Sequence, residues 1–69
     1  MINDETLNLS VRKFLKQFGV EAQRTIEDAI RQADVAGQLE GRTAVSASVN
    51  LELAGLDTRF ELKDEIGFK

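Results

Sequence analysis

The sequence of 69 residues predicts a small α+β domain, in which two N-terminal helices pack on one face of a C-terminal antiparallel β-hairpin. Three observations lead to this fold class. Apolar residues recur every three or four positions through the first half of the chain, as they do along the buried stripe of a helix. They alternate with polar residues between positions 44 and 54 and again after position 58, as they do along a half-buried strand. Glycine and aspartate stand between the two alternating stretches and mark a turn.

The first helix is predicted over residues about 4–18. Asn3 is a typical N-cap, and the acidic Asp4 and Glu5 suit the positive end of the helix dipole. Gly19 is expected to end this helix in the left-handed conformation that glycine adopts most easily. The apolar stripe of the first helix consists of Leu7, Val11, Phe14, Leu15 and Phe18.

The second helix is predicted over residues about 21–36, with Gly37 as its stop. Glu27 and Arg31 are four residues apart and support its exposed side. A connection as short as Gly19-Val20 requires the two helices to be antiparallel or steeply crossed. Small side chains dominate the second stripe, which consists of Ala22, Ile26, Ala29, Ile30, Ala33 and Ala36.

The hairpin is predicted from strands over residues about 43–53 and about 58–68, joined by a loop of residues 54–57. Its register follows from the requirement that both apolar sets face the same side. Pairing Leu51 with Phe60 meets this requirement. The same register sets Glu52 opposite Arg59, which is a favourable cross-strand pair, whereas a tighter loop would oppose two acidic residues.

The composition excludes several classes of site. Without cysteine there is no disulfide, and without cysteine or histidine the usual zinc and transition-metal sites are absent, so no cofactor is expected. A net charge of −3 disfavours nucleic acid or an anionic membrane as the main partner. No apolar run approaches the roughly 20 residues of a membrane span, and the acidic start is unlike a signal peptide. A cytoplasmic protein is therefore expected.

The edge of the first strand predicts a homodimer. A core this small seldom stabilises a domain alone. In a chain without disulfides or metals, self-association is the remaining means of stabilising the fold. Strand 43–53 contains no proline or lysine, and Glu52 is its only charge, so its edge is unprotected. Two copies are expected to pair antiparallel about a two-fold axis near Ser48, which gives a four-stranded sheet. The expected dimer edge consists of Val45, Ala47, Ser48, Val49 and Leu51.

Five short segments between Asn3-Asp4-Glu5 and Ile26-Glu27 carry a resemblance to known proteins. They resemble a family of short bacterial proteins of unknown function, of about 70 residues. The resemblance extends over the whole chain and implies a bacterial cytoplasmic protein, with no assigned activity. Glu21 stands where a threonine or serine is common in that family, and glutamate caps a helix less well. The segments that carry the resemblance are Asn3-Asp4-Glu5, Arg12-Lys13-Phe14-Leu15-Lys16, Gly19-Val20, Gln23-Arg24 and Ile26-Glu27.

Candidate catalytic groups are few, and the chain is expected not to be an enzyme. The common nucleophile–base pairs need a histidine or a cysteine, so Ser46 and Ser48 are interpreted as solvated serines on the polar face of a strand. Asp64 falls on the apolar side of its strand, opposite Ala47. It is either a carboxylate with a binding or acid role, or a group that reaches water where the strand ends or bulges.

A basic patch supplies the alternative function, a nucleic-acid-binding module that resembles a winged helix-turn-helix. Two helices joined by a glycine turn and followed by a hairpin fit that arrangement, in which the second helix would contact DNA. Acidic residues on the second helix oppose this interpretation, because they repel phosphate. The favoured hypothesis is thus a non-enzymatic protein that associates with itself and with an unidentified protein partner. The patch consists of Arg12, Lys13, Lys16 and Arg24.

Overall fold

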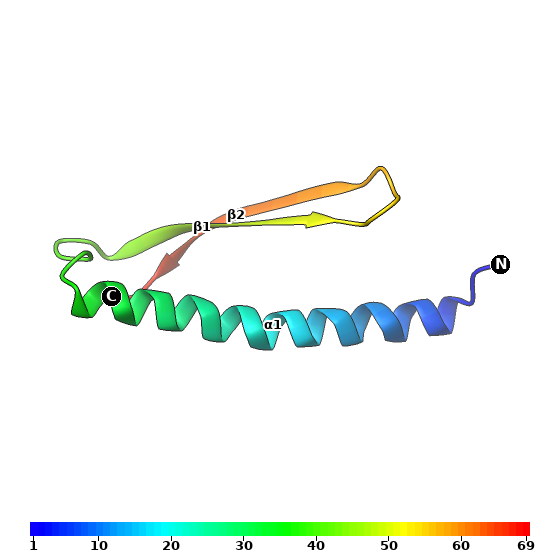
Figure 1. Ribbon diagram of the computed structural model, residues 1–69, viewed down its shortest axis with the longest axis horizontal. Coiled ribbons are helices and arrows are strands. Elements are labelled where there is room, and N and C mark those ends of the chain that lie inside the picture. The colour runs from blue at the N-terminus through cyan, green and yellow to red at the C-terminus, as the bar shows by residue number, and fades with distance from the viewer. The chain divides into compact units, whose positions relative to one another are not determined.

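The computed structural model describes all residues from Met1 to Lys69 and contains one helix and one β-hairpin (Figure 1). Helix α1 spans Asp4–Val35, strand β1 spans Ala44–Glu52 and strand β2 spans Arg59–Gly67. The chain divides into two compact units, Met1–Gln38 and Leu39–Lys69, and each is described by itself. The predicted α+β class and the hairpin are confirmed, and the predicted pair of helices is wrong.

Helix α1 is a single helix of 32 residues that passes through Gly19 without a break (Figure 1). The left-handed conformation expected at Gly19 is absent, because the glycines with positive φ are Gly37, Gly41 and Gly55. The boundary predicted between residues 18 and 21 therefore does not exist. The helix-turn-helix of the alternative hypothesis also fails, since it required a turn at Gly19-Val20.

The phase of the apolar stripe explains why the helix continues. Phe18 is followed four residues later by Ala22, so the two predicted stripes join as one stripe of constant helical spacing. A glycine inside a helix costs about 1 kcal/mol relative to alanine. A break there would instead leave four carbonyl groups and four N–H groups without intrahelical partners. The continuous helix therefore has the lower free energy of the two arrangements.

Each end of α1 is defined by a capping motif that its sequence predicts. The Asn3 side chain accepts a hydrogen bond of 3.0 Å from the Thr6 N–H, which confirms the predicted N-cap. At the other end Gly37 has a φ of 77°, and its N–H donates to the Asp34 carbonyl at 3.0 Å. The Gln38 N–H donates to the Ala33 carbonyl at 2.9 Å. This pair of bonds is the Schellman motif, so the predicted stop at Gly37 is confirmed.

The hairpin has the predicted register. β1 and β2 are antiparallel, with Leu51 opposite Phe60 and Glu52 opposite Arg59. Both strands are one residue shorter at each end than predicted, which is the usual uncertainty of a strand boundary. The Leu56 N–H donates to the Leu53 carbonyl at 3.0 Å, and Gly55 has a φ of 79°. A positive φ at the third residue of the turn is the geometry of a type II turn.

The chain buries little of its apolar surface. Leu39 is the one buried hydrophobic residue, with 5% of its surface exposed. Large apolar residues are exposed on both units, including Phe14 and Phe18 of α1 and Phe60 and Leu62 of β2. The predicted packing of a helical layer on the hairpin concerns the placement of the two units, and it stays a prediction.

Substitution of Gly19 tests the continuous helix. We expect Gly19→Ala to raise the free energy of unfolding by up to about 1 kcal/mol, because alanine is the better helix former and no atom lies within 4 Å of the added Cβ. Chemical denaturation followed by circular dichroism measures this change.

Gly37→Ala is the matched control. Its added Cβ also meets nothing within 4 Å, but its φ of 77° is unfavourable for alanine, so we expect a loss of stability. A helix that ended at Gly19 would instead make both substitutions destabilising.

Candidate functional site

The outer edge of β1 is open in the hairpin. The sheet has two strands, so β1 pairs with β2 alone. The Thr43 carbonyl accepts a hydrogen bond of 2.9 Å from the Phe68 N–H opposite it. Because hydrogen-bonded and non-hydrogen-bonded pairs alternate in an antiparallel ladder, the even-numbered residues of β1 direct their N–H and C=O groups away from β2. These residues are Ala44, Ser46, Ser48, Asn50 and Glu52.

One face of the hairpin is apolar. Val45, Ala47, Val49 and Leu51 are half-buried, and the residues between them from Ser46 onwards are exposed. The alternation predicted for β1 is thereby confirmed. On β2 the burial is lower, with Phe60 57% and Leu62 55% exposed. The apolar face is thus most open towards the turn of the hairpin.

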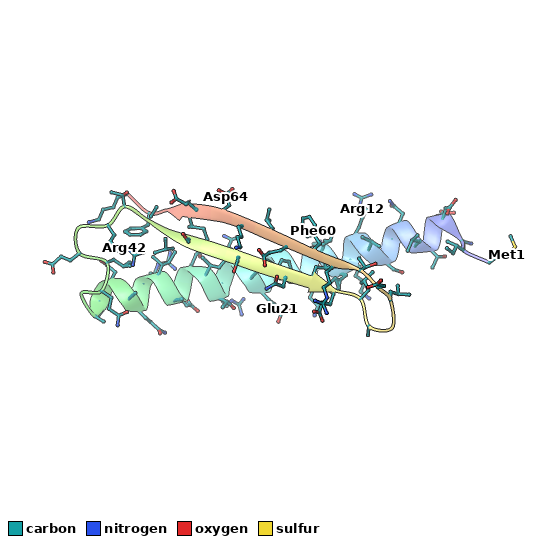
Figure 2. All side chains as sticks on the ribbon, turned by 90° about the horizontal axis from the view of Figure 1, so that it is seen from above. Met1, Arg12, Glu21, Arg42, Phe60 and Asp64 are labelled. Atoms are coloured by element: carbon teal, nitrogen blue, oxygen red, sulfur yellow. The ribbon has the colours of Figure 1, made fainter.

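Asp64 is exposed on β2 and lies opposite Ala47, as the register predicts (Figure 2). Its Oδ1 accepts a hydrogen bond of 2.7 Å from the Glu65 N–H. The carboxylate reaches water, as the second of the two interpretations predicts, but β2 neither ends nor bulges at this position. No group of three or more acidic side chains is arranged to hold a metal ion.

The strand serines stand beside charged residues of β2. Ser46 lies opposite Glu65 and Ser48 lies opposite Lys63, in a shallow hollow on the hairpin. Lys63 Nζ pairs with Glu61 Oε1 at 3.3 Å and not with a serine hydroxyl. Neither serine hydroxyl takes part in a hydrogen bond.

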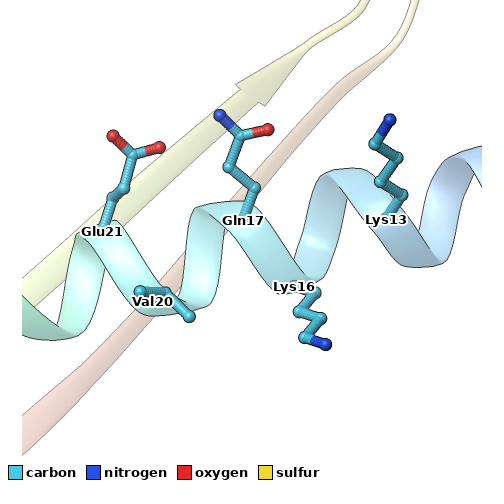
Figure 3. Close-up of a pocket in the computed structure, with 5 residues that line it drawn as sticks. All are labelled: Lys13, Lys16, Gln17, Val20 and Glu21. Carbon is cyan, nitrogen blue, oxygen red and sulfur yellow. The ribbon is translucent and has the colours of Figure 1, made fainter.

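The basic patch lies along α1 and is not gathered at one point. Lys13, Gln17 and Glu21 form one row of side chains, and Lys16 and Val20 form the next (Figure 3). These five residues border a shallow groove on a single helix, with an acidic residue at one end. Arg24 lies eight residues beyond Lys16, which is about 12 Å along the axis of a continuous helix. Arg24 therefore does not join the cluster of Arg12, Lys13 and Lys16.

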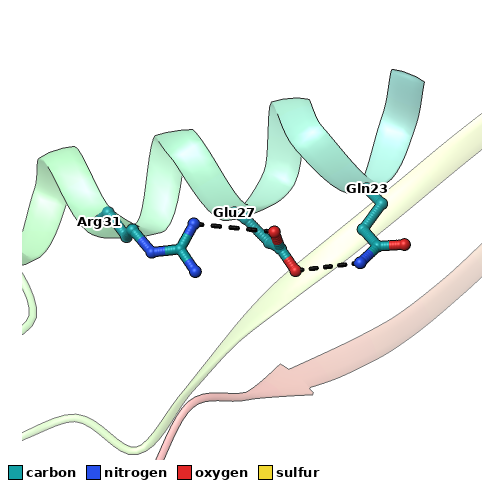
Figure 4. A network of polar contacts seen from close by, with 3 residues as sticks. All are labelled: Gln23, Glu27 and Arg31. Carbon is teal, nitrogen blue, oxygen red and sulfur yellow. Dashed lines mark hydrogen bonds and ion pairs between the residues drawn. The ribbon is translucent and has the colours of Figure 1, made fainter. Parts of the chain in front are cut away.

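A short polar chain lies on the second half of α1 (Figure 4). Glu27 pairs with Arg31 at 3.7 Å, as the spacing predicts, and accepts a hydrogen bond of 3.2 Å from Gln23. All three side chains are exposed. Such pairs stabilise a helix by only about 0.2–0.5 kcal/mol, so Glu27 remains available to other partners.

The joined apolar stripe of α1 is the feature that sequence reasoning missed. Its first half is exposed, with Phe14 at 59% and Phe18 at 44%. In its second half Ala22, Ile26, Ile30 and Ala33 are half-buried. The signal was available in the sequence, because the spacing between Phe18 and Ala22 keeps the helical phase.

The exposure of Asp64 predicts a small effect of its removal. We expect Asp64→Asn to change the free energy of unfolding by less than about 0.5 kcal/mol, as is usual for exposed sites. The midpoint of urea denaturation measures this change. A loss of several kcal/mol would show that the carboxylate is engaged by a group absent from the isolated hairpin.

Comparison with known proteins identifies a family without an assigned activity. No curated protein and no solved structure matches the chain. Helix α1 lacks an apolar stretch long enough to cross a membrane. A model described as a family of unknown function, DUF6494, matches residues 2–69 and so covers almost the whole chain. The chain therefore belongs to the family of unknown function DUF6494, in agreement with the resemblance found in its sequence.

Proposed function

We propose that this protein acts by association and not by catalysis, as a homodimer in which two β1 strands pair antiparallel about a two-fold axis at Ser48. The observation that carries the proposal is the open edge of β1, where five residues direct backbone donors and acceptors outwards. An open strand edge of this kind is a template for another strand. The edge of β2 is less suited, because its exposed face carries alternating charges from Arg59 to Glu65.

The proposed pairing is compatible with every side chain along β1. A two-fold axis at Ser48 sets Val45 opposite Leu51 of the second copy and Ala47 opposite its Val49. The polar face then sets Ser46 opposite Asn50 of the second copy. The apolar residues thus remain on one face, and no like charges are opposed.

Pairing also relieves the weakness of the isolated hairpin. A two-stranded sheet is marginally stable in water, and three or more strands with an apolar face are needed for independent stability. The four-stranded sheet joins two apolar faces into one larger face. An exposed apolar face of this kind is typical of a binding surface, and we propose that the dimer binds a protein partner there.

Charge substitution at Ser48 tests the edge pairing. Ser48→Lys and Ser48→Glu each place like charges opposite one another at the axis, so we expect each to weaken the dimer about fivefold. An equimolar mixture of the two variants opposes unlike charges and recovers the wild-type dissociation constant. Sedimentation equilibrium measures all three values.

The mixture serves as the control for any general effect of a charged residue on β1. Dissociation constants that are equal in both variants and the wild type would contradict pairing at Ser48. A wild-type mass of one chain, 7.7 kDa, at high micromolar concentration would contradict the homodimer itself.

A further inference from the structure

The apolar stripe of α1 has an eleven-residue repeat. Val11 is followed by Ala22 and Ala33, Leu15 by Ile26, and Phe18 by Ala29, each eleven residues further along. Eleven residues make three helical turns at 3.67 residues per turn, so the stripe runs almost straight along the helix. A straight stripe on a helix of 32 residues offers a seam about 40–48 Å long.

The same stripe is symmetric about Ala22. Reversing the direction of the helix about this residue exchanges Val11 with Ala33, Leu15 with Ala29 and Phe18 with Ile26. Phe14 and Ile30, which widen the stripe, exchange with each other. Every apolar residue of the stripe from position 11 to position 33 thus meets another apolar residue when two copies lie antiparallel. Large side chains in the first half meet alanines at two of these layers, and the small Ala22 lies at the centre.

The charges beside the stripe change sign between its two halves, so an antiparallel second copy brings opposite charges together. Arg12 and Lys16 lie on one flank of the first half, and Glu27 and Asp34 lie on the same flank of the second half. Figure 3 shows Lys16 projecting away from the row of Lys13, Gln17 and Glu21. Within the chain neither Arg12 nor Lys16 makes an ion pair, and two cations four residues apart repel each other.

We propose that the stripe of α1 binds the stripe of a second copy in an antiparallel helix pair centred on Ala22. In this pair Lys16 faces Glu27 of the second copy, and Arg12 faces its Asp34. In a parallel pair this flank would face the opposite flank of the second copy, so neither cation would meet Glu27 or Asp34. The inference concerns a surface separate from β1, and it does not depend on the pairing of the strands.

Charge reversal on the flank tests the proposal. We expect Arg12→Glu with Lys16→Glu to weaken self-association at least about tenfold, because four attractive pairs become repulsive. Glu27→Lys with Asp34→Lys has the same effect for the same reason. Mixed in equal amounts, the two double variants restore unlike pairs at all four positions, so we expect wild-type affinity in the mixture alone.

Cysteine substitution gives a local readout in a chain that has no cysteine of its own. Ala22→Cys lies on the proposed axis and is expected to form a disulfide-linked dimer under mild oxidation. Val20→Cys lies away from the stripe and serves as the matched control that does not cross-link. Val11→Cys is expected to link only when mixed with Ala33→Cys.

Each contrary result overturns the helix pair. Linkage of Val11→Cys to itself would show a parallel pair, and no linkage of any stripe variant would show that the stripes of two copies do not meet. Neither result bears on Ser48, so failure of the helix pair is distinguishable from failure of the strand pairing. Circular dichroism of each variant confirms that the helix is retained.

Discussion

The unbroken backbone ladder of α1 is the constraint on which the rest of the structure depends. Gly19 weakens the helix by about 1 kcal/mol, but a break would leave up to eight backbone groups to find other partners. Because the ladder continues, two short stripes become one stripe with a fixed phase. The same continuity fixes the charges along the helix, so that Lys16 and Arg24 are separated, and Glu27 and Asp34 follow Arg12 and Lys16 on one flank of the stripe. Neither the apolar seam nor its charge order exists in a broken helix.

The elements that were predictable are those for which two independent signals agree. The hairpin register follows both from the alternation of apolar residues and from the opposition of Glu52 and Arg59. The stop at Gly37 follows both from the glycine and from the end of the apolar period beyond Ala36. At Gly19 the two signals disagree, because the period continues through the glycine. The predicted break follows the glycine, whereas the structure follows the helical phase, because the phase over many residues involves more interactions than one unfavourable position.

The sequence predicts only those features of the candidate site that follow from the hairpin register. Asp64 lies opposite Ala47 as predicted, but its exposure depends on how deep the apolar face is, and two strands alone make a shallow one. The predicted basic patch requires a turn that brings Arg24 back towards Lys16, and the continuous helix α1 has no such turn. The hollows described on the helix and on the hairpin, each taken by itself, are open to solvent. Both proposals therefore concern surfaces of the single units, the edge of β1 and the stripe of α1.

The two proposed self-complementary surfaces, if both are used, restrict how copies of the chain assemble. An interface in which the same residues meet about a two-fold axis closes on itself, so either surface alone gives a dimer. With both surfaces in use, the dimer remains closed only if the axis at Ser48 and the axis at Ala22 coincide. Perpendicular axes that intersect give a closed tetramer, axes that intersect at certain smaller angles give larger closed assemblies, and axes that do not intersect continue as an open filament. The short segment between Val35 and Ala44 joins the two units, so its conformation decides which of these assemblies forms.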